Sequence, residues 1–129
     1  MATRTRWTLR IEQLRTRLAF DGAATPRPVD VSLTIHGLFR ATPREPEDAM
    51  DLDALCAWIT GTWSRTPATP MLETRVNQLL GHVFGLDPRV LEVRAAVWRV
   101  APRGQASRVG VEREATRSQF TAQLRLQRA

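Results

Sequence analysis

Two residue types that often carry out proton transfer are missing from this sequence. The chain has 129 residues and no tyrosine, and lysine is absent because all 19 of its basic residues are arginine. Without lysine, Schiff-base catalysis and lysine general bases are excluded. Without tyrosine, phenolic proton donors are excluded as well. Any proton transfer in a reaction of this protein must therefore use other groups.

Cysteine and long apolar runs are also scarce. The single cysteine, Cys56, cannot form an intrachain disulfide, which fits a reducing compartment, and we expect a cytoplasmic protein. No run of about 18 apolar residues occurs, so we expect no transmembrane helix and no membrane partner. The short basic N-terminus leads into alternating residues and does not resemble the apolar core of a signal peptide.

Groups that bind metals or form covalent intermediates are few. Zinc sites need three or four Cys, His or acidic ligands, and the sequence has only His36, His82 and Cys56 to offer nitrogen or sulfur ligands. Cys56 lies on the apolar face of a predicted helix, where it is expected to act as a small buried hydrophobe. No serine lies in a nucleophile elbow, and no glycine-rich phosphate loop is present. We therefore expect neither a metal nor a cofactor.

The charge balance is strongly basic, with a net charge of +6 and a pI of about 11.4. Such values invite a nucleic-acid interpretation. The arginines are scattered along the chain, however, and no aromatic-rich segment alternates with them. The pattern favours a solvated surface over a nucleic-acid partner.

Periodicity predicts the order of the elements. Alternation at period two predicts four strands, at 7–20, 29–36, 91–98 and 108–113. The alternation slips near Gln13, which predicts a bulge in the first strand. Apolar residues at helical spacing predict one helix from about Asp51 to Ser64, with Asp51 or Asp48 as its cap, and a second over 71–84. Residues 101–104 are expected to end the third strand before the fourth one begins.

These elements predict an α+β fold of order ββααββ, with an antiparallel four-stranded sheet and two helices on one face. At this chain length we expect a single domain, over residues 1–113, followed by a polar C-terminal tail at 114–129. The pattern of the tail does not distinguish an extended segment from a helix or a loop. Val109 and Val111 are predicted to face inward, and Trp98 to face outward into a contact between subunits.

Glu73 has an unusual position on the predicted second helix. On a helical wheel of roughly 100° per residue it lies between Leu80 and Phe84 on the apolar arc, and Arg75 and His82 lie opposite. We expect Thr69 to cap this helix, with Pro70 in its first turn. A carboxylate on a buried face is costly unless something hydrogen-bonds it. Glu73 is therefore expected either to pair with an arginine, such as Arg99 or Arg75, or to bind a ligand.

The order of elements and several short motifs resemble the dihydroneopterin aldolase family, whose subunits have the tunnelling fold. Leu72-Glu73 is similar to the Leu-Glu motif that opens the second helix of that family, and Met50–Leu55 is similar to its Asp-Tyr-x-x-Leu helix start. Arg108–Val111 resembles the last strand with its Val-Gly-Val motif. Arg99 stands before that motif at the spacing of the family's catalytic lysine. The resemblance covers residues 7–113.

The resemblance implies a pterin pocket between subunits of a homo-tetramer or octamer. In the family, the helix-opening Glu binds the amino group and a neighbouring ring N–H of the pterin. A lysine and a tyrosine then move protons during a retro-aldol cleavage that releases glycolaldehyde in folate biosynthesis, without a metal or a cofactor. Carried over, this assigns substrate binding to Glu73, Leu72, Leu52 and Asp51, and the catalytic position to Arg99.

The reacting positions depart from the family pattern. Arg99 replaces the lysine, Leu52 replaces the tyrosine, and Asp21 is the only acid in the first loop. A guanidinium stays protonated in proteins, so Arg99 is a poor proton acceptor, although it can stabilise negative charge. Three hypotheses follow: an aldolase or epimerase working with Arg99 or water, a pterin- or purine-binding protein without lyase activity, and an assembly protein with a vestigial pocket.

Overall fold

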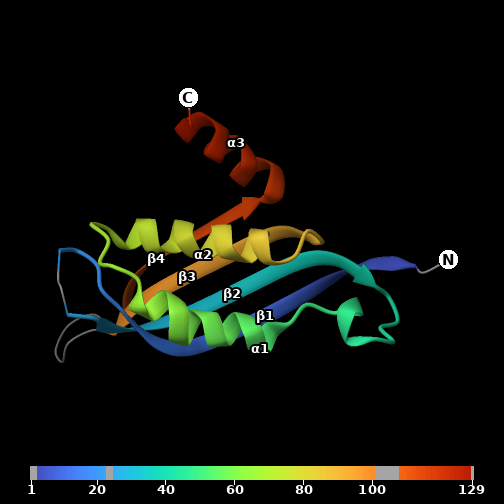
Figure 1. The fold of residues 1–129 in the computed structure, drawn as a ribbon, viewed down its shortest axis with the longest axis horizontal. Helices are drawn as coiled ribbons and strands as arrows, with labels where there is room; N and C mark the ends of the chain where they lie inside the picture. Colours follow the sequence, from blue (N-terminus) through green and yellow to red (C-terminus); the bar gives the residue numbers. More distant parts are fainter. Residues whose placement is uncertain (1–2, 23–24, 101–107, 129) are drawn as a thin grey trace.

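The fold is built on one antiparallel sheet. The computed structural model describes residues 3–22, 25–100 and 108–128. The sheet order is β1-β2-β3-β4, so that each strand pairs with the next one in sequence (Figure 1). The strands are β1 (Arg4–Leu18), β2 (Arg27–Arg40), β3 (Val90–Val100) and β4 (Arg108–Thr116). The predicted strands are therefore present. β2, β3 and β4 extend beyond their predicted bounds, whereas β1 begins and ends earlier than predicted, and the predicted break at 101–104 lies outside the described residues.

The hairpin of β1 and β2 contains the predicted bulge. The register shifts between Ile11 and Leu14, and Gln13 adopts a positive φ of 54°. Beyond the bulge, Leu18 pairs with Arg27 at the end of the hairpin, and Val29 pairs with Arg99 of β3. This register decides which side chains meet at that end of the sheet.

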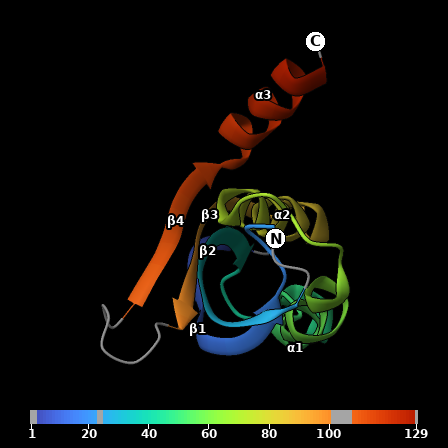
Figure 2. The same ribbon diagram turned by 90° about the vertical axis from the view of Figure 1, so that its left-hand side faces the viewer.

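The helical layer lies on one side of the sheet, as Figure 2 shows for α1 (Leu52–Ala57) and α2 (Leu72–Leu86). A short 3-10 turn, η1 (Pro46–Asp48), precedes α1. The helix predicted at 51–64 continues from α1 through a wider π-helical segment, η2 (Trp58–Thr62), into a 3-10 turn, η3 (Trp63–Arg65). The Asp51 carboxylate accepts a hydrogen bond of 2.9 Å from the Ala54 amide, which confirms the predicted cap of α1.

The core lies between the helices and the sheet. In β2 the apolar residues face the core and the polar residues between them are partly exposed, as predicted. The buried stripe of α2 belongs to the same core and packs mainly over β3 and β4. The apolar residues of β2 and α2 that are at most 1% exposed are Val29, Val31, Leu33, Ile35, Val76, Leu79, Leu80 and Val83. No described helix combines the length and the apolar character needed to cross a membrane.

The start of α2 differs from the prediction. Met71 is the N-cap residue and supplies no side-chain cap, so the assignment of Thr69 as the cap was wrong. The Thr69 hydroxyl instead donates a 3.0 Å hydrogen bond to the Met71 carbonyl. Thr69 also forms a β-bridge with Phe20. The segment before α2 is therefore attached to the end of β1, and this attachment occupies the residue predicted to cap the helix.

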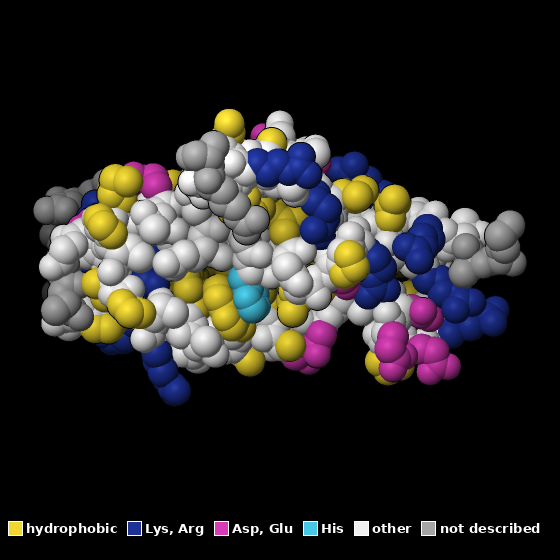
Figure 3. Space-filling view, turned by 45° about the horizontal axis from the view of Figure 1, so that its top comes forward, with side chains coloured by type: hydrophobic (Ala, Val, Ile, Leu, Met, Phe, Trp, Pro, Cys, Tyr) yellow, Lys and Arg dark blue, Asp and Glu magenta, His cyan; other side chains and the backbone are white. Residues whose placement is uncertain are grey.

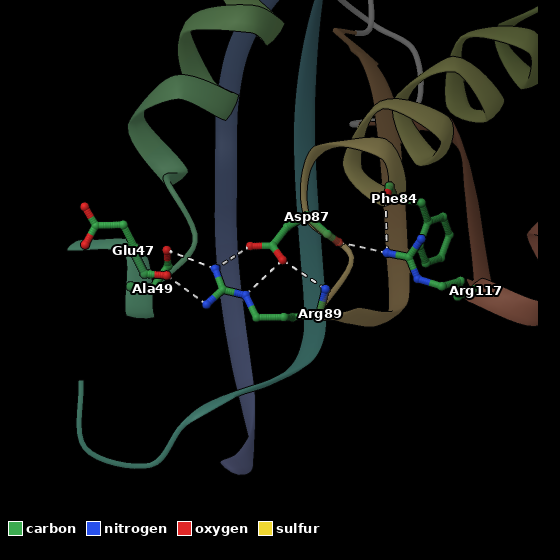
Figure 4. Close-up of polar contacts among 6 residues, drawn as sticks. All are labelled: Glu47, Ala49, Phe84, Asp87, Arg89 and Arg117. Atoms are coloured by element: carbon green, nitrogen blue, oxygen red, sulfur yellow. Dashed lines mark hydrogen bonds and ion pairs between the residues drawn. The ribbon is translucent and has the colours of Figure 1, made fainter. Parts of the chain in front are cut away.

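The end of α2 is fixed by a buried carboxylate and two arginines (Figure 4). The Asp87 side chain accepts hydrogen bonds of 2.8–3.0 Å from the Arg89 side chain and backbone, and Arg89 reaches the Glu47 carbonyl at 2.8 Å. Arg117 donates to the Phe84 and Asp87 carbonyls at 3.0 and 2.8 Å. Burial alone would raise the pKa of Asp87, but these hydrogen bonds and the two positive charges hold the pKa below its usual value.

The last part of the chain adds a third helix to the predicted order. β4 continues to Thr116, and α3 (Arg117–Arg128) then extends away from the body of the molecule, as Figures 1 and 2 show. Val111 packs against the core, but Val109 is 45% exposed, so its predicted inward position was wrong. Val109 lies at the start of the edge strand β4, and Figure 2 shows this strand beginning away from the two helices and running up towards α2.

An aromatic stack joins the two helical segments of this layer. The His82 imidazole of α2 lies 3.6 Å from the Trp58 ring, centroid to centroid, with an interplanar angle of 4°. Trp58 in turn stacks on the buried Trp63. His82 was expected on the exposed face, whereas it is half-buried, and burial lowers its pKa.

We expect this stack to make stability depend on pH. The pKa of His82 is lowered on folding, so the unfolded chain binds its proton first as the pH falls through about 6.5. Above that pH, neutral His82 contributes fully to the free energy of unfolding. This contribution is lost as the pH falls through the pKa that His82 has in the folded state. Thermal unfolding at several pH values between 7.5 and 5 should show this loss. His82→Phe, which keeps a ring against Trp58, should flatten the profile, and an unchanged profile would contradict the assignment.

Candidate functional site

Three charged side chains converge at the end of the sheet where β1 and β3 stop and β2 begins. Asp21 follows β1 with a φ of 56°, in the left-handed region. Its Oδ2 atom lies 3.4 Å from Arg27 Nη2 and 3.7 Å from Arg99 Nη1. One carboxylate oxygen is therefore shared by two guanidinium groups, and the cluster of Asp21, Arg27 and Arg99 carries one positive charge in excess.

The strand register explains why the two arginines meet. Val29 pairs with Arg99, and Arg27 is two residues before Val29, so both arginines belong to the same face of the sheet. The Arg27 guanidinium lies 4.1 Å from the centroid of the Phe20 ring and donates a 3.0 Å hydrogen bond to the Phe20 carbonyl. Its Nε atom is buried and has no hydrogen-bond partner in the described part of the chain.

Arg99 follows the phase of the buried residues Val93, Ala95 and Val97, as the sequence pattern predicts, but its side chain remains 40% exposed at the end of β3. Its ion pair is with Asp21. The alternative prediction, an ion pair between Arg99 and Glu73, is not found among the described residues. A guanidinium so placed can bind or stabilise negative charge, but it cannot accept a proton at neutral pH.

Glu73 is exposed, so the prediction that it lies on the buried face of its helix was wrong. Among the described residues it forms no ion pair and no side-chain hydrogen bond. It occupies the first turn of α2, where the helix dipole favours a negative charge. Figure 1 shows the start of α2 at the same end of the molecule as the end of β3, which carries Arg99.

Arg75 takes the buried position instead, although the wheel placed it on the polar side. Its side chain is 0% exposed, and its guanidinium donates to the carbonyl oxygens of Ala19, Thr66 and Pro67. The bond to Ala19 is 2.7 Å long. The Thr66 hydroxyl and the Gln78 side chain also accept from it. Burying this side chain is tolerable because its donors are satisfied by carbonyl, hydroxyl and amide oxygens.

The other predicted binding residues lie apart from the charged cluster. Leu72 is buried in the core, and the Asp51 carboxylate is occupied as the cap of α1. Leu52 is half-buried and lines an apolar cavity of about 230 Å³, and Trp7 and Met50 also line this cavity. Glu73 does not line this cavity, and Figure 1 shows α1 and α2 starting at different points along the long axis.

Sequence reasoning missed Arg27 and the role of Asp21 as the link between two arginines. The phase of Arg27 with Val29 and Val31 was a usable signal, since all three are on one face of β2. Trp98, predicted to face a subunit contact, is half-buried with the Arg108 guanidinium 4.7 Å from its ring centroid. Within the described ranges, no group of three or more His, Cys, Asp or Glu side chains is placed to hold a metal ion.

Comparisons with known proteins identify the fold. No protein-family model matches the sequence, and no curated protein sequence matches it significantly. A dihydroneopterin aldolase from Burkholderia thailendensis bound to guanine superposes with a TM-score of 0.72 at 12% identity, covering 87% of this chain and 92% of that one. The Escherichia coli dihydroneopterin aldolase in complex with neopterin gives 0.68 at 12% identity, covering 84% and 97%. The chain thus has the fold that its sequence motifs predicted.

Proposed function

We propose that this protein binds a pterin-like heterocycle between two copies of the chain, with Glu73 as the anchor of the ring. The observation that carries the proposal is the position of Glu73. A carboxylate opens α2 at the end of the molecule that also holds the Asp21–Arg27–Arg99 cluster, and it has no partner among the described residues. A carboxylate that binds a ligand has to be free to accept hydrogen bonds from it, and Glu73 meets this requirement.

The chemistry of a carboxylate suits this type of ring. A 2-amino-4-oxo heterocycle presents an amino group and a ring N–H side by side, and a carboxylate accepts both in a bidentate pair. Guanine offers the same edge. The solved structures of the same fold with guanine and with neopterin support this ligand class for the present chain.

A second copy is needed to complete the pocket. Glu73 is exposed in the single chain, and the apolar cavity beside Leu52 lies elsewhere on the same subunit. Assembly into a homo-tetramer or octamer would bring Leu52 of one copy towards Glu73 of another, as the family resemblance implies. The exposed acid would then face an apolar wall and a bound ring.

Retro-aldol cleavage is the second candidate function, and we expect it to be slow. Arg99 cannot accept a proton, Leu52 has no hydroxyl group, and Asp21 is already paired with two arginines. Arg99 can still stabilise the negative charge that develops during cleavage. The site therefore favours binding over turnover of a dihydropterin in folate biosynthesis.

Two assays on the purified protein test these functions. We expect neopterin to raise the melting temperature, because a ligand that binds only the folded state stabilises it. We expect dihydroneopterin to release glycolaldehyde slowly, and Arg99→Lys to increase the rate by about 100-fold, the lower end of the range for general acid–base catalysis. Absence of any neopterin effect would contradict the binding proposal. No gain of rate in Arg99→Lys would show that the missing lysine does not limit turnover.

A further inference from the structure

The Asp21–Arg27–Arg99 cluster has an arrangement that the ring-binding role of Glu73 does not explain. Two guanidinium groups approach a single carboxylate oxygen, at 3.4 and 3.7 Å. The two tightest arginine–carboxylate pairs of the described chain are much closer, at 2.6 Å for Arg15 with Asp30 and 2.8 Å for Arg89 with Asp87, and the others outside this cluster range from 3.1 to 3.6 Å. Asp21 therefore neutralises its two partners only loosely.

The cluster is also accessible and has donors to spare. The side chains of Asp21, Arg27 and Arg99 are 39–45% exposed. Among the described residues Arg99 makes only its 3.7 Å ion pair with Asp21, whereas the partnerless Nε atom of Arg27 is buried and is not a donor that a ligand reaches. The Arg27 guanidinium is held against the Phe20 ring and carbonyl, so it is oriented before any ligand arrives. Figure 3 shows other arginines gathered in patches on one face of the molecule, with acidic side chains beside some of them.

We propose that Arg27 and Arg99 form a subsite for a phosphate group, so that the ligand of this protein is a phosphorylated heterocycle. The inference rests on the proposed function, since Glu73 would hold the ring and the two arginines its phosphate. A phosphate offers several oxygens and up to two negative charges, and guanidinium groups bind it in bidentate geometry. It would satisfy both arginines better than one shared carboxylate oxygen does.

In this arrangement the Asp21 carboxylate competes with the phosphate for Arg27 and Arg99. Its carboxylate occupies the position of one phosphate oxygen and moves aside when the ligand binds. Removing the negative charge of Asp21 should therefore strengthen phosphate binding, whereas a merely structural ion pair would predict no gain. Asparagine is the suitable replacement, because it tolerates the positive φ at this position better than most residues.

The test compares neopterin with neopterin monophosphate, which differ only in the phosphate, by calorimetry at low salt. We expect wild type to bind the phosphorylated compound about tenfold more tightly, the size of one charge-assisted hydrogen bond. Arg27→Gln should bring the affinity ratio close to one, and Asp21→Asn should raise it above the wild-type ratio. The matched control Arg125→Gln removes an equal charge from exposed α3 and should leave the ratio unchanged.

Each outcome separates this inference from the proposed function. Equal affinity for the two compounds in wild type would overturn the phosphate subsite and leave ring binding intact. No binding of either compound would overturn the proposed function itself. A fall in the ratio for Arg125→Gln as large as that for Arg27→Gln would show attraction by overall charge. Arg27→Gln can weaken the fold because it removes the contact with Phe20, so Asp21→Asn is the decisive variant. If the affinity ratio of Asp21→Asn were equal to or below that of wild type, the inference would also be overturned.

Discussion

Glu73→Gln is expected to reduce the affinity for neopterin by about 100-fold, because it removes a charge-assisted bidentate pair worth roughly 2–3 kcal/mol. A carboxamide keeps one acceptor oxygen and presents an N–H group where the ring also presents a donor. The fold should be unaffected, because Glu73 is exposed and makes no side-chain contact that stabilises the described chain. Its free energy of unfolding should change by no more than about 0.5 kcal/mol.

The measurement is calorimetric titration with neopterin, alongside the melting temperature with and without ligand. Asp53→Asn is a matched control, since Asp53 is also an exposed acid in the first turn of a helix, α1. It should bind neopterin as wild type does. Light scattering should show the same oligomeric state in all three proteins, so that a loss of binding is not a loss of assembly. Unchanged neopterin affinity in Glu73→Gln would remove the anchor role.

Period-two and helical patterns predicted the main elements because those patterns reflect burial directly. Val29, Val31, Leu33 and Ile35 alternate with polar residues in β2, and their inward positions follow from the geometry of a strand. The slip near Gln13 marked the bulge for the same reason. α3 could not be predicted, because its polar sequence has few apolar residues to fix a face.

The candidate site was predicted less well, because its geometry depends on contacts between residues distant in sequence. The wheel placed Glu73 inside and Arg75 outside on the basis of angular position alone. Arg75 is buried because carbonyls from the end of β1 and from the segment before α2 happen to face it. Likewise, Asp21 meets Arg99 only because the sheet register sets β2 between β1 and β3. Neither arrangement has a local sequence signal.

Arg75→Met is expected to destabilise the folded chain strongly. Methionine fills much of the same space, but it cannot donate to the carbonyl oxygens of Ala19, Thr66 and Pro67. Each buried acceptor left without a partner costs about 1–3 kcal/mol. We expect a loss of at least about 3 kcal/mol in the free energy of unfolding, and a fall of about 10 °C in melting temperature.

Chemical unfolding with urea measures this loss, and Arg65→Met is its matched control because Arg65 is an exposed arginine in the turn that leads to the same segment. The control should change stability by less than about 0.5 kcal/mol. Arg75→Lys should fall between wild type and Arg75→Met, since an ammonium reaches fewer of the acceptors than the planar guanidinium does. If Arg75→Met proved as stable as the control, water or a backbone shift would have to satisfy those carbonyls. Arg75 would then not be what holds the end of β1 against the start of α2.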